Sequence, residues 1–82
     1  MRNLVRAIRF MVAAEYEAIQ LYTQLAESTD NKLAVQVLRE IADEELVRVG
    51  EFLRLLHELA PNDEKFYAKG AKEVEEKIKR MK

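Results

Sequence analysis

Apolar residues recur at steps of three and four along most of the chain and do not alternate for long, which is the spacing of helices and not of strands. Two polar breaks, at residues 28–31 and 60–63, divide this pattern into three parts. Pro61 ends the second part, because proline disfavours helical backbone in the residue before it. We therefore predict an all-α fold with helices over about residues 2–28, 31–59 and 63–79.

The first two helices are predicted to form an antiparallel hairpin, because the break between them is short. Thr29 or Asp30 is the expected cap of the second helix, since both side chains can accept hydrogen bonds from free backbone N–H groups. Gly50 lies in the middle of that helix and would let another helix, such as the third, approach closely. At 82 residues, the chain is expected to be a single domain, 1–82.

The apolar face of each long helix has a glutamate near its centre. These are Glu15 in the first helix and Glu45 in the second, with Arg48 three residues further on at the edge of the apolar face. Glu15 precedes Thr29 by fourteen residues and Glu45 follows Asp30 by fifteen, so an antiparallel hairpin brings the two carboxylates to the same height. A carboxylate in an apolar seam is costly unless it is paired or bound to a metal. Both glutamates are therefore candidate metal ligands.

Two helices cannot enclose a site of this kind. The joint apolar surface of the hairpin requires a further hairpin, and the simplest arrangement is a twofold dimer that forms a four-helix bundle. A single domain of this size buries only about 60–65% of the surface that its unfolded chain exposes, which also favours association. We expect a homodimer or a larger homo-oligomer, in which two copies of each glutamate meet.

Composition narrows the possible partners. Fourteen Lys and Arg against fifteen Asp and Glu leave a net charge of −1, which argues against nucleic acid as a partner. The longest apolar run covers only residues 10–14, so no membrane span is expected. Cysteine is absent, which excludes disulfides and thiolate ligands, and the N-terminal residues lack an apolar signal core. A cytoplasmic protein is the expectation.

Three stretches carry a resemblance to a known family. They are AEYEAIQLY at 14–22, IADEELVRVGEFL at 41–53, and FYAKG at 66–70 followed by EVE at 73–75. In these stretches the chain resembles the ferritin-like superfamily, and within it the short two-helix branch of encapsulated ferritins and small rubrerythrin-like proteins. That resemblance implies a ferritin-like four-helix bundle formed by dimerisation.

The resemblance also implies roles for single residues. In the family, one helix supplies a Glu and the other a Glu-x-x-His motif, and together they bind iron. Carried over, Glu15 and Glu45 match the carboxylate ligands of the metal, and Tyr22 matches an aromatic residue that lies near such sites. Glu17 is expected to belong to the solvent-exposed face, and it is also the one candidate for the acidic metal entry path of encapsulated ferritins. An active site of this kind would make the protein a ferroxidase-type oxidoreductase, related to iron oxidation or storage.

Arg48 stands where the family has histidine, and arginine cannot ligate a metal because it has no free lone pair. A family-type dimer balances four carboxylates with two divalent metals, whereas here two arginines already supply two positive charges. Arg48 would then replace part of the metal charge. The site would hold a single divalent cation, with Mn, Mg or Ca favoured over an iron pair, or it would be a metal-free Glu/Arg cluster. An ordinary surface pair of Arg48 with Glu44, four residues earlier, is a further alternative.

Two functions follow from these alternatives. The first is a ferritin-like metal-binding protein with a degenerate carboxylate site at the dimer interface. The second is a metal-free structural or interaction protein without catalytic activity. Association with an encapsulin shell is not favoured, although it is not excluded, because residues up to Met81 and Lys82 show no recognisable small apolar docking tail.

Overall fold

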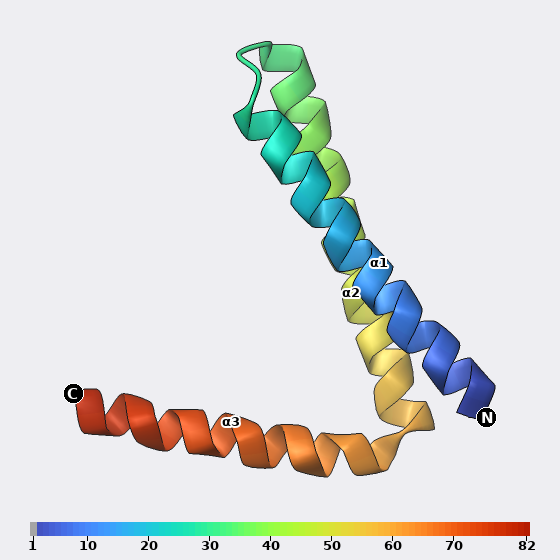
Figure 1. The fold of residues 1–82 in the computed structure, drawn as a ribbon, viewed down its shortest axis with the longest axis vertical. Coiled ribbons are helices and arrows are strands. Elements are labelled where there is room, and N and C mark those ends of the chain that lie inside the picture. Colours follow the sequence, from blue (N-terminus) through green and yellow to red (C-terminus); the bar gives the residue numbers. More distant parts are fainter. Residues whose placement is uncertain (1) are drawn as a thin grey trace.

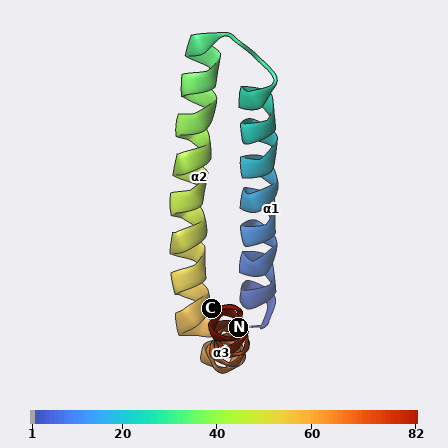
Figure 2. The same cartoon turned by 90° about the vertical axis from the view of Figure 1, so that its left-hand side faces the viewer.

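The computed structural model describes residues 2–82 and contains, within them, only helices and short connections. The helices are α1 (Arg2–Glu27), α2 (Lys32–Leu59) and α3 (Pro61–Met81). Figures 1 and 2 show α1 and α2 side by side and antiparallel, with α3 leaving their open end at a wide angle. The predicted all-α fold of a hairpin with a third helix is confirmed. Met1, the first residue of the expected domain 1–82, lies outside the described residues.

Asn31 caps α2. Its backbone is extended, and its side-chain Oδ1 accepts a hydrogen bond from the N–H of Ala34 at 3.0 Å. The hydroxyl oxygen of Thr29 instead accepts from the N–H of Asn31 at 3.2 Å, which orders the turn before the helix. The expectation that Thr29 or Asp30 caps α2 is therefore wrong by one or two positions, because the chain needs those residues to reverse direction.

The contact between α1 and α2 is made by small and branched apolar residues at helical spacing. Within residues 3–82, the buried residues are all apolar: Ile8 and Ala26 on α1, and Ala42, Val49 and Leu56 on α2. Gly50 contributes nothing to this contact, since an added Cβ would meet no atom within 4 Å. The close approach expected at Gly50, from helix α3 among others, is thus not made within the described chain.

The described chain is one helix layer thick. Its Cα atoms span 44 × 43 × 14 Å with a radius of gyration of 16.7 Å. A compact chain of this length would have a radius of gyration of about 12 Å. Stable domains bury their apolar faces between at least two packed layers of structure. The faces of the hairpin above and below this single layer therefore have no cover from the chain itself.

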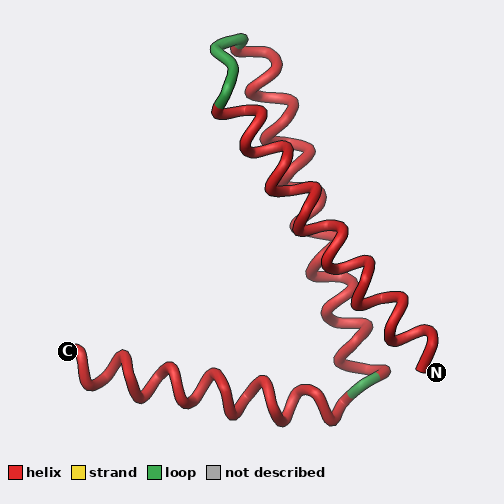
Figure 3. The backbone as a smooth tube through the Cα atoms, viewed as in Figure 1, coloured by secondary structure: helices red, strands yellow, loops and turns green. Residues whose placement is uncertain are grey.

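Helix α3 begins two residues earlier than expected, because Pro61 occupies its first turn, where proline's missing N–H costs no hydrogen bond. No residue of α3 is buried. Figure 3 shows that only a short loop separates it from α2. Two polar contacts fix its start: Arg9 on α1 pairs with Asp63 at 2.7 Å, and His57 Nδ1 lies 3.3 Å from Glu64 Oε1. No helix within the described part of the chain has the length and apolar character needed to cross a membrane.

Candidate metal centre

Glu15 and Glu45 lie at nearly the same height in the hairpin. Glu15 is twelve residues before the end of α1, and Glu45 is thirteen residues after the start of α2. An α-helix rises about 1.5 Å per residue, so the two positions differ in height by only about one residue. Both glutamates belong to the half-buried part of their helices. The structure therefore places both predicted carboxylates at one level of the α1–α2 pair.

Glu15 and Glu45 occupy positions on the same side of the hairpin. On each helix the buried contact residues lie roughly 20–60° to one side of the glutamate, at 100° per residue. On both helices the glutamate is rotated away from the buried contact in the same sense, as seen along the chain direction. Because the two helices run in opposite directions, this rotation places both glutamates on one side of the hairpin. We call this side the carboxylate face. It also includes Met11, Ala18, Tyr22 and Leu25 of α1, and Val37, Ile41, Arg48, Phe52 and Leu55 of α2.

The carboxylate face is open in the single chain. Met11, Leu25, Val37 and Leu55 keep 43–45% of their surface exposed. Tyr22, Ile41 and Phe52 are half-buried on the same face. Apolar side chains that are exposed or half-exposed therefore surround the two glutamates on this face.

Glu15 has an unsatisfied carboxylate. Its Oε2 atom is buried and, among the described residues, no hydrogen-bond partner reaches it. A buried carboxylate oxygen without a partner costs free energy, since it has lost its water without gaining a donor or a cation. Glu15 is therefore the point of the site where a hydrogen-bond donor or a cation is missing.

Glu45 is paired with Arg48. The guanidinium Nη1 donates to Glu45 Oε1 at 2.6 Å, and the side chains are 16% exposed for Glu45 and 48% exposed for Arg48. Residues three apart on a helix are neighbours, so this pair needs no distortion. The sequence also allowed a surface pair of Arg48 with Glu44. The structure shows that Arg48 pairs with Glu45 instead. Arg48 instead neutralises the candidate ligand itself.

One chain does not supply a complete metal site. Within residues 2–82, no group of three or more His, Cys, Asp or Glu side chains is placed to hold a metal ion. Glu15 and Glu45 offer oxygen donors only, which suit hard divalent cations such as Mg, Ca and Mn. Such cations take six or more ligands, so two carboxylates need donors from outside the chain. A second copy of the carboxylate face would double the number of carboxylates.

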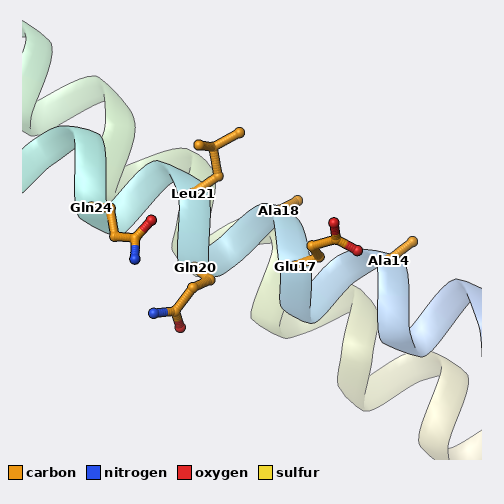
Figure 4. Close-up of a pocket in the computed structure, with 6 residues that line it drawn as sticks. All are labelled: Ala14, Glu17, Ala18, Gln20, Leu21 and Gln24. Carbon is orange, nitrogen blue, oxygen red and sulfur yellow. The ribbon is translucent and has the colours of Figure 1, made fainter.

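A groove runs along α1 next to the carboxylate face. Figure 4 shows its lining side chains on the side of α1 opposite to α2: Ala14, Glu17, Ala18, Gln20, Leu21 and Gln24. Glu15 and Glu45 do not line it. Glu17, the sequence-based candidate for a metal entry path, therefore lies on the outer side of α1, and Ala18 forms the border between groove and carboxylate face.

The comparisons with known proteins agree with this fold. No protein-family model matches the chain. The chain is 36% identical over 74 residues to a ferritin-like–encapsulin shell fusion protein of Pyrococcus furiosus, covering 90% of this chain and 21% of that protein. It is 37% identical over 77 residues to the encapsulin nanocompartment cargo protein EncC of Myxococcus xanthus, covering 94% of this chain and 56% of EncC. The chain thus spans about a fifth and just over half of these curated relatives.

A solved structure shows the same arrangement of helices. The crystal structure of the encapsulated ferritin domain from Pyrococcus furiosus superposes with a TM-score of 0.89 at 35% identity, covering 92% of this chain and 76% of that one. The fold is therefore that of a ferritin-like domain. The chain belongs to the encapsulated ferritin family.

The expectation that disfavoured an encapsulin shell is wrong. One relative is itself fused to a shell protein, and the other is an encapsulin cargo protein. The expectation depended on the lack of a recognisable apolar docking tail. A covalent fusion needs no such tail, so its absence is no measure of whether a ferritin-like domain associates with a shell.

Proposed function

We propose that the chain is an encapsulin-associated ferritin-like protein, in which two copies join their carboxylate faces to form a binding site for a divalent cation. The relationship to a ferritin domain makes ferrous iron the substrate that this site would take in the shell, while its oxygen donors also suit Mn and Mg. The single observation that carries the proposal is the buried, unpartnered Oε2 of Glu15 at the centre of an uncovered apolar face. The relationship to an encapsulated ferritin domain and to an encapsulin cargo protein supports it.

The dimer supplies what one chain lacks. Two single-layer hairpins placed face to face make the two layers that a stable domain needs, and they cover the exposed apolar residues of the carboxylate face. The twofold axis brings together two copies of Glu15 and two of Glu45. Four carboxylates can fill most of the ligand positions of a divalent cation, whereas the two of one chain would leave most of those positions to water.

The residues of the site have separate tasks. Glu15 has a free carboxylate oxygen with which to bind the cation. Glu45 is shared between Arg48 and the cation, so its oxygens are held in place before the cation arrives. The surrounding apolar residues, among them Phe52 and Ile41, would exclude water once the dimer forms, which strengthens the attraction between cation and carboxylates. Tyr22 lies on the same face and would contact the site from the side.

The alternative is a dimer of the same shape that binds no metal. The Glu45–Arg48 pair favours it, because the pair satisfies one carboxylate without any cation. The unpartnered oxygen of Glu15 favours the metal-binding function instead.

Elemental analysis with light scattering separates the two functions. We expect untagged protein, purified without chelator, to be at least dimeric and to contain a stoichiometric divalent metal. Glu15→Gln should remove the metal, while Glu17→Gln, the same change on the outer side of α1, should keep it. A metal-free dimer would support the alternative, and a monomer would contradict both.

Association with a shell needs its own experiment. The chain is co-expressed with the encapsulin shell protein of the same organism and the particles are isolated by size. We expect the chain to elute with the particles and to resist added protease while they are intact. A chain that always elutes apart from assembled shells, or that protease removes from intact ones, would refute the association.

A further inference from the structure

The position of Arg48 differs from that of the other arginine paired within α2. Arg54 pairs with Glu58 at 3.4 Å, and both side chains are about 70% exposed, at 68% and 71%. That pair is an ordinary surface contact. Arg48 pairs at 2.6 Å with a carboxylate that is only 16% exposed and lies at the centre of the carboxylate face. The two arginines therefore carry the same charge on the same helix in different surroundings.

The charges at the proposed dimer interface can be counted from these residues. Two copies of Glu15 and two of Glu45 bring four negative charges to the carboxylate faces, and two copies of Arg48 return two positive charges. Two negative charges are left, which is the charge that a single divalent cation neutralises. Without Arg48, the four carboxylates would face one another without any positive charge, in a site with little water, where like charges repel strongly.

We propose that Arg48 is a built-in counter-ion, which lets the dimer form without metal and limits the site to one divalent cation per dimer. This inference rests on the proposed dimer. Its mechanism is charge balance: the guanidinium holds Glu45 at 2.6 Å in the metal-free state, and only Glu15 is left with a free buried oxygen to attract a cation. Arg48 does not bind the metal itself. It acts through Glu45.

The test compares three variants with the wild type, in EDTA and with Mn²⁺ alone as the probe. Arg48→Gln leaves four uncompensated negative charges at the interface. The double variant Glu45→Gln/Arg48→Gln leaves two, as in the wild type. Arg54→Gln removes an equal charge from the outer side of α2 and is the matched control. Sedimentation velocity gives the dimer dissociation constant, and equilibrium dialysis gives the Mn²⁺ bound per dimer.

We expect the wild type and Arg54→Gln to be dimeric in both conditions and to bind one Mn²⁺ per dimer. Arg48→Gln should dimerise at least about tenfold more weakly in EDTA, and Mn²⁺ should restore the dimer with two ions bound. The double variant should dimerise in EDTA like the wild type and bind Mn²⁺ more weakly. A general loss of packing would not be repaired by either the metal or the second substitution.

The inference is overturned if Arg48→Gln dimerises in EDTA as tightly as the wild type, or if the wild type binds two Mn²⁺ per dimer. If Arg48→Gln is unfolded in EDTA, the double variant decides: a dimer like the wild type supports the counter-ion role, and an unfolded chain refutes it. A failure of metal binding alone has a different signature: the wild type would bind no Mn²⁺, while dimerisation of the variants in EDTA would still follow the charge count. A wild type that is monomeric in EDTA would overturn the inference as well.

Discussion

Arg9 of α1 and Asp63 of α3 are 54 positions apart in the sequence, and their side chains form an ion pair at 2.7 Å. A second polar contact, between His57 and Glu64, lies at the same corner of the molecule. Helix α3 buries no residue of its own. The direction in which it leaves the hairpin is therefore held by exposed polar contacts and a short loop, and not by an apolar core.

Breaking this ion pair should free α3 without unfolding the hairpin. For Asp63→Asn we expect a loss of less than about 1 kcal/mol in the free energy of unfolding, because exposed ion pairs contribute little. The distribution of distances between α1 and α3 should broaden. The chain has no cysteine, so spin labels on Gln24→Cys and Lys79→Cys report this distance uniquely.

The labelled chain is diluted with unlabelled protein so that distances within one chain dominate. Glu58→Gln serves as the control, since it breaks an exposed ion pair that lies within α2 alone. An unchanged distance distribution in Asp63→Asn would show that the loop alone directs α3.

The buried oxygen of Glu15 should make the metal-free protein less stable than it could be. Glu15→Gln keeps the shape of the side chain and removes the charge, so it should raise the free energy of unfolding in EDTA by about 1 kcal/mol. The same variant should lose any rise in melting temperature on adding Mn²⁺. Urea denaturation with and without Mn²⁺ measures both effects.

Glu17→Gln, on the outer side of α1, should change neither quantity. If Glu15→Gln instead lowers the free energy of unfolding in EDTA, the carboxylate of Glu15 must have a hydrogen-bond or charge partner in the assembled protein. It has no such partner within the single chain that the structure describes.

The repeat of apolar residues was enough to predict the hairpin, because helical spacing fixes which side chains can meet. Ile8, Ala42 and Val49 are buried where that spacing puts them. The common height of Glu15 and Glu45 follows from the same reasoning, since residues equally far from the turn of an antiparallel pair lie side by side. These features depend on local geometry alone.

Other features could not be predicted in this way. Some depend on which of two similarly placed side chains a residue pairs with, and others on contacts between residues far apart in the sequence. Arg48 can reach a glutamate three or four residues earlier, and only the structure shows that it pairs with Glu45. The contact of Arg9 with Asp63 joins two helices whose relative direction no periodic pattern encodes. The proposed association with an encapsulin shell depends on a second protein, and it is supported by the relatives and not by any residue pattern.

The cap of α2 is a case in which neighbouring residues compete for one role. Asn31→Ala should lower the free energy of unfolding by about 1 kcal/mol, because it removes the acceptor of the Ala34 N–H. Asp30→Ala is the matched control, one position earlier and also exposed. It should cost less than half as much. Equal losses in urea denaturation would mean that the turn as a whole, and not the cap, stabilises the start of α2.

Gly50 is a poor helix former in the middle of α2, with nothing packed against it. No atom would lie within 4 Å of an added Cβ, and the residue is about 140° around α2 from Glu45, away from the carboxylate face. Gly50→Ala should therefore raise the free energy of unfolding by about 1 kcal/mol and leave the dimer unchanged.

Gly70→Ala provides the comparison in α3, where an added Cβ would also meet open space. Denaturation and light scattering are measured on the same samples. If Gly50→Ala breaks a larger assembly into dimers while Gly70→Ala does not, a further copy of the chain must pack against the outer side of α2. The glycine would then serve an interface between dimers, and the close approach expected at Gly50 would occur between chains instead of within one.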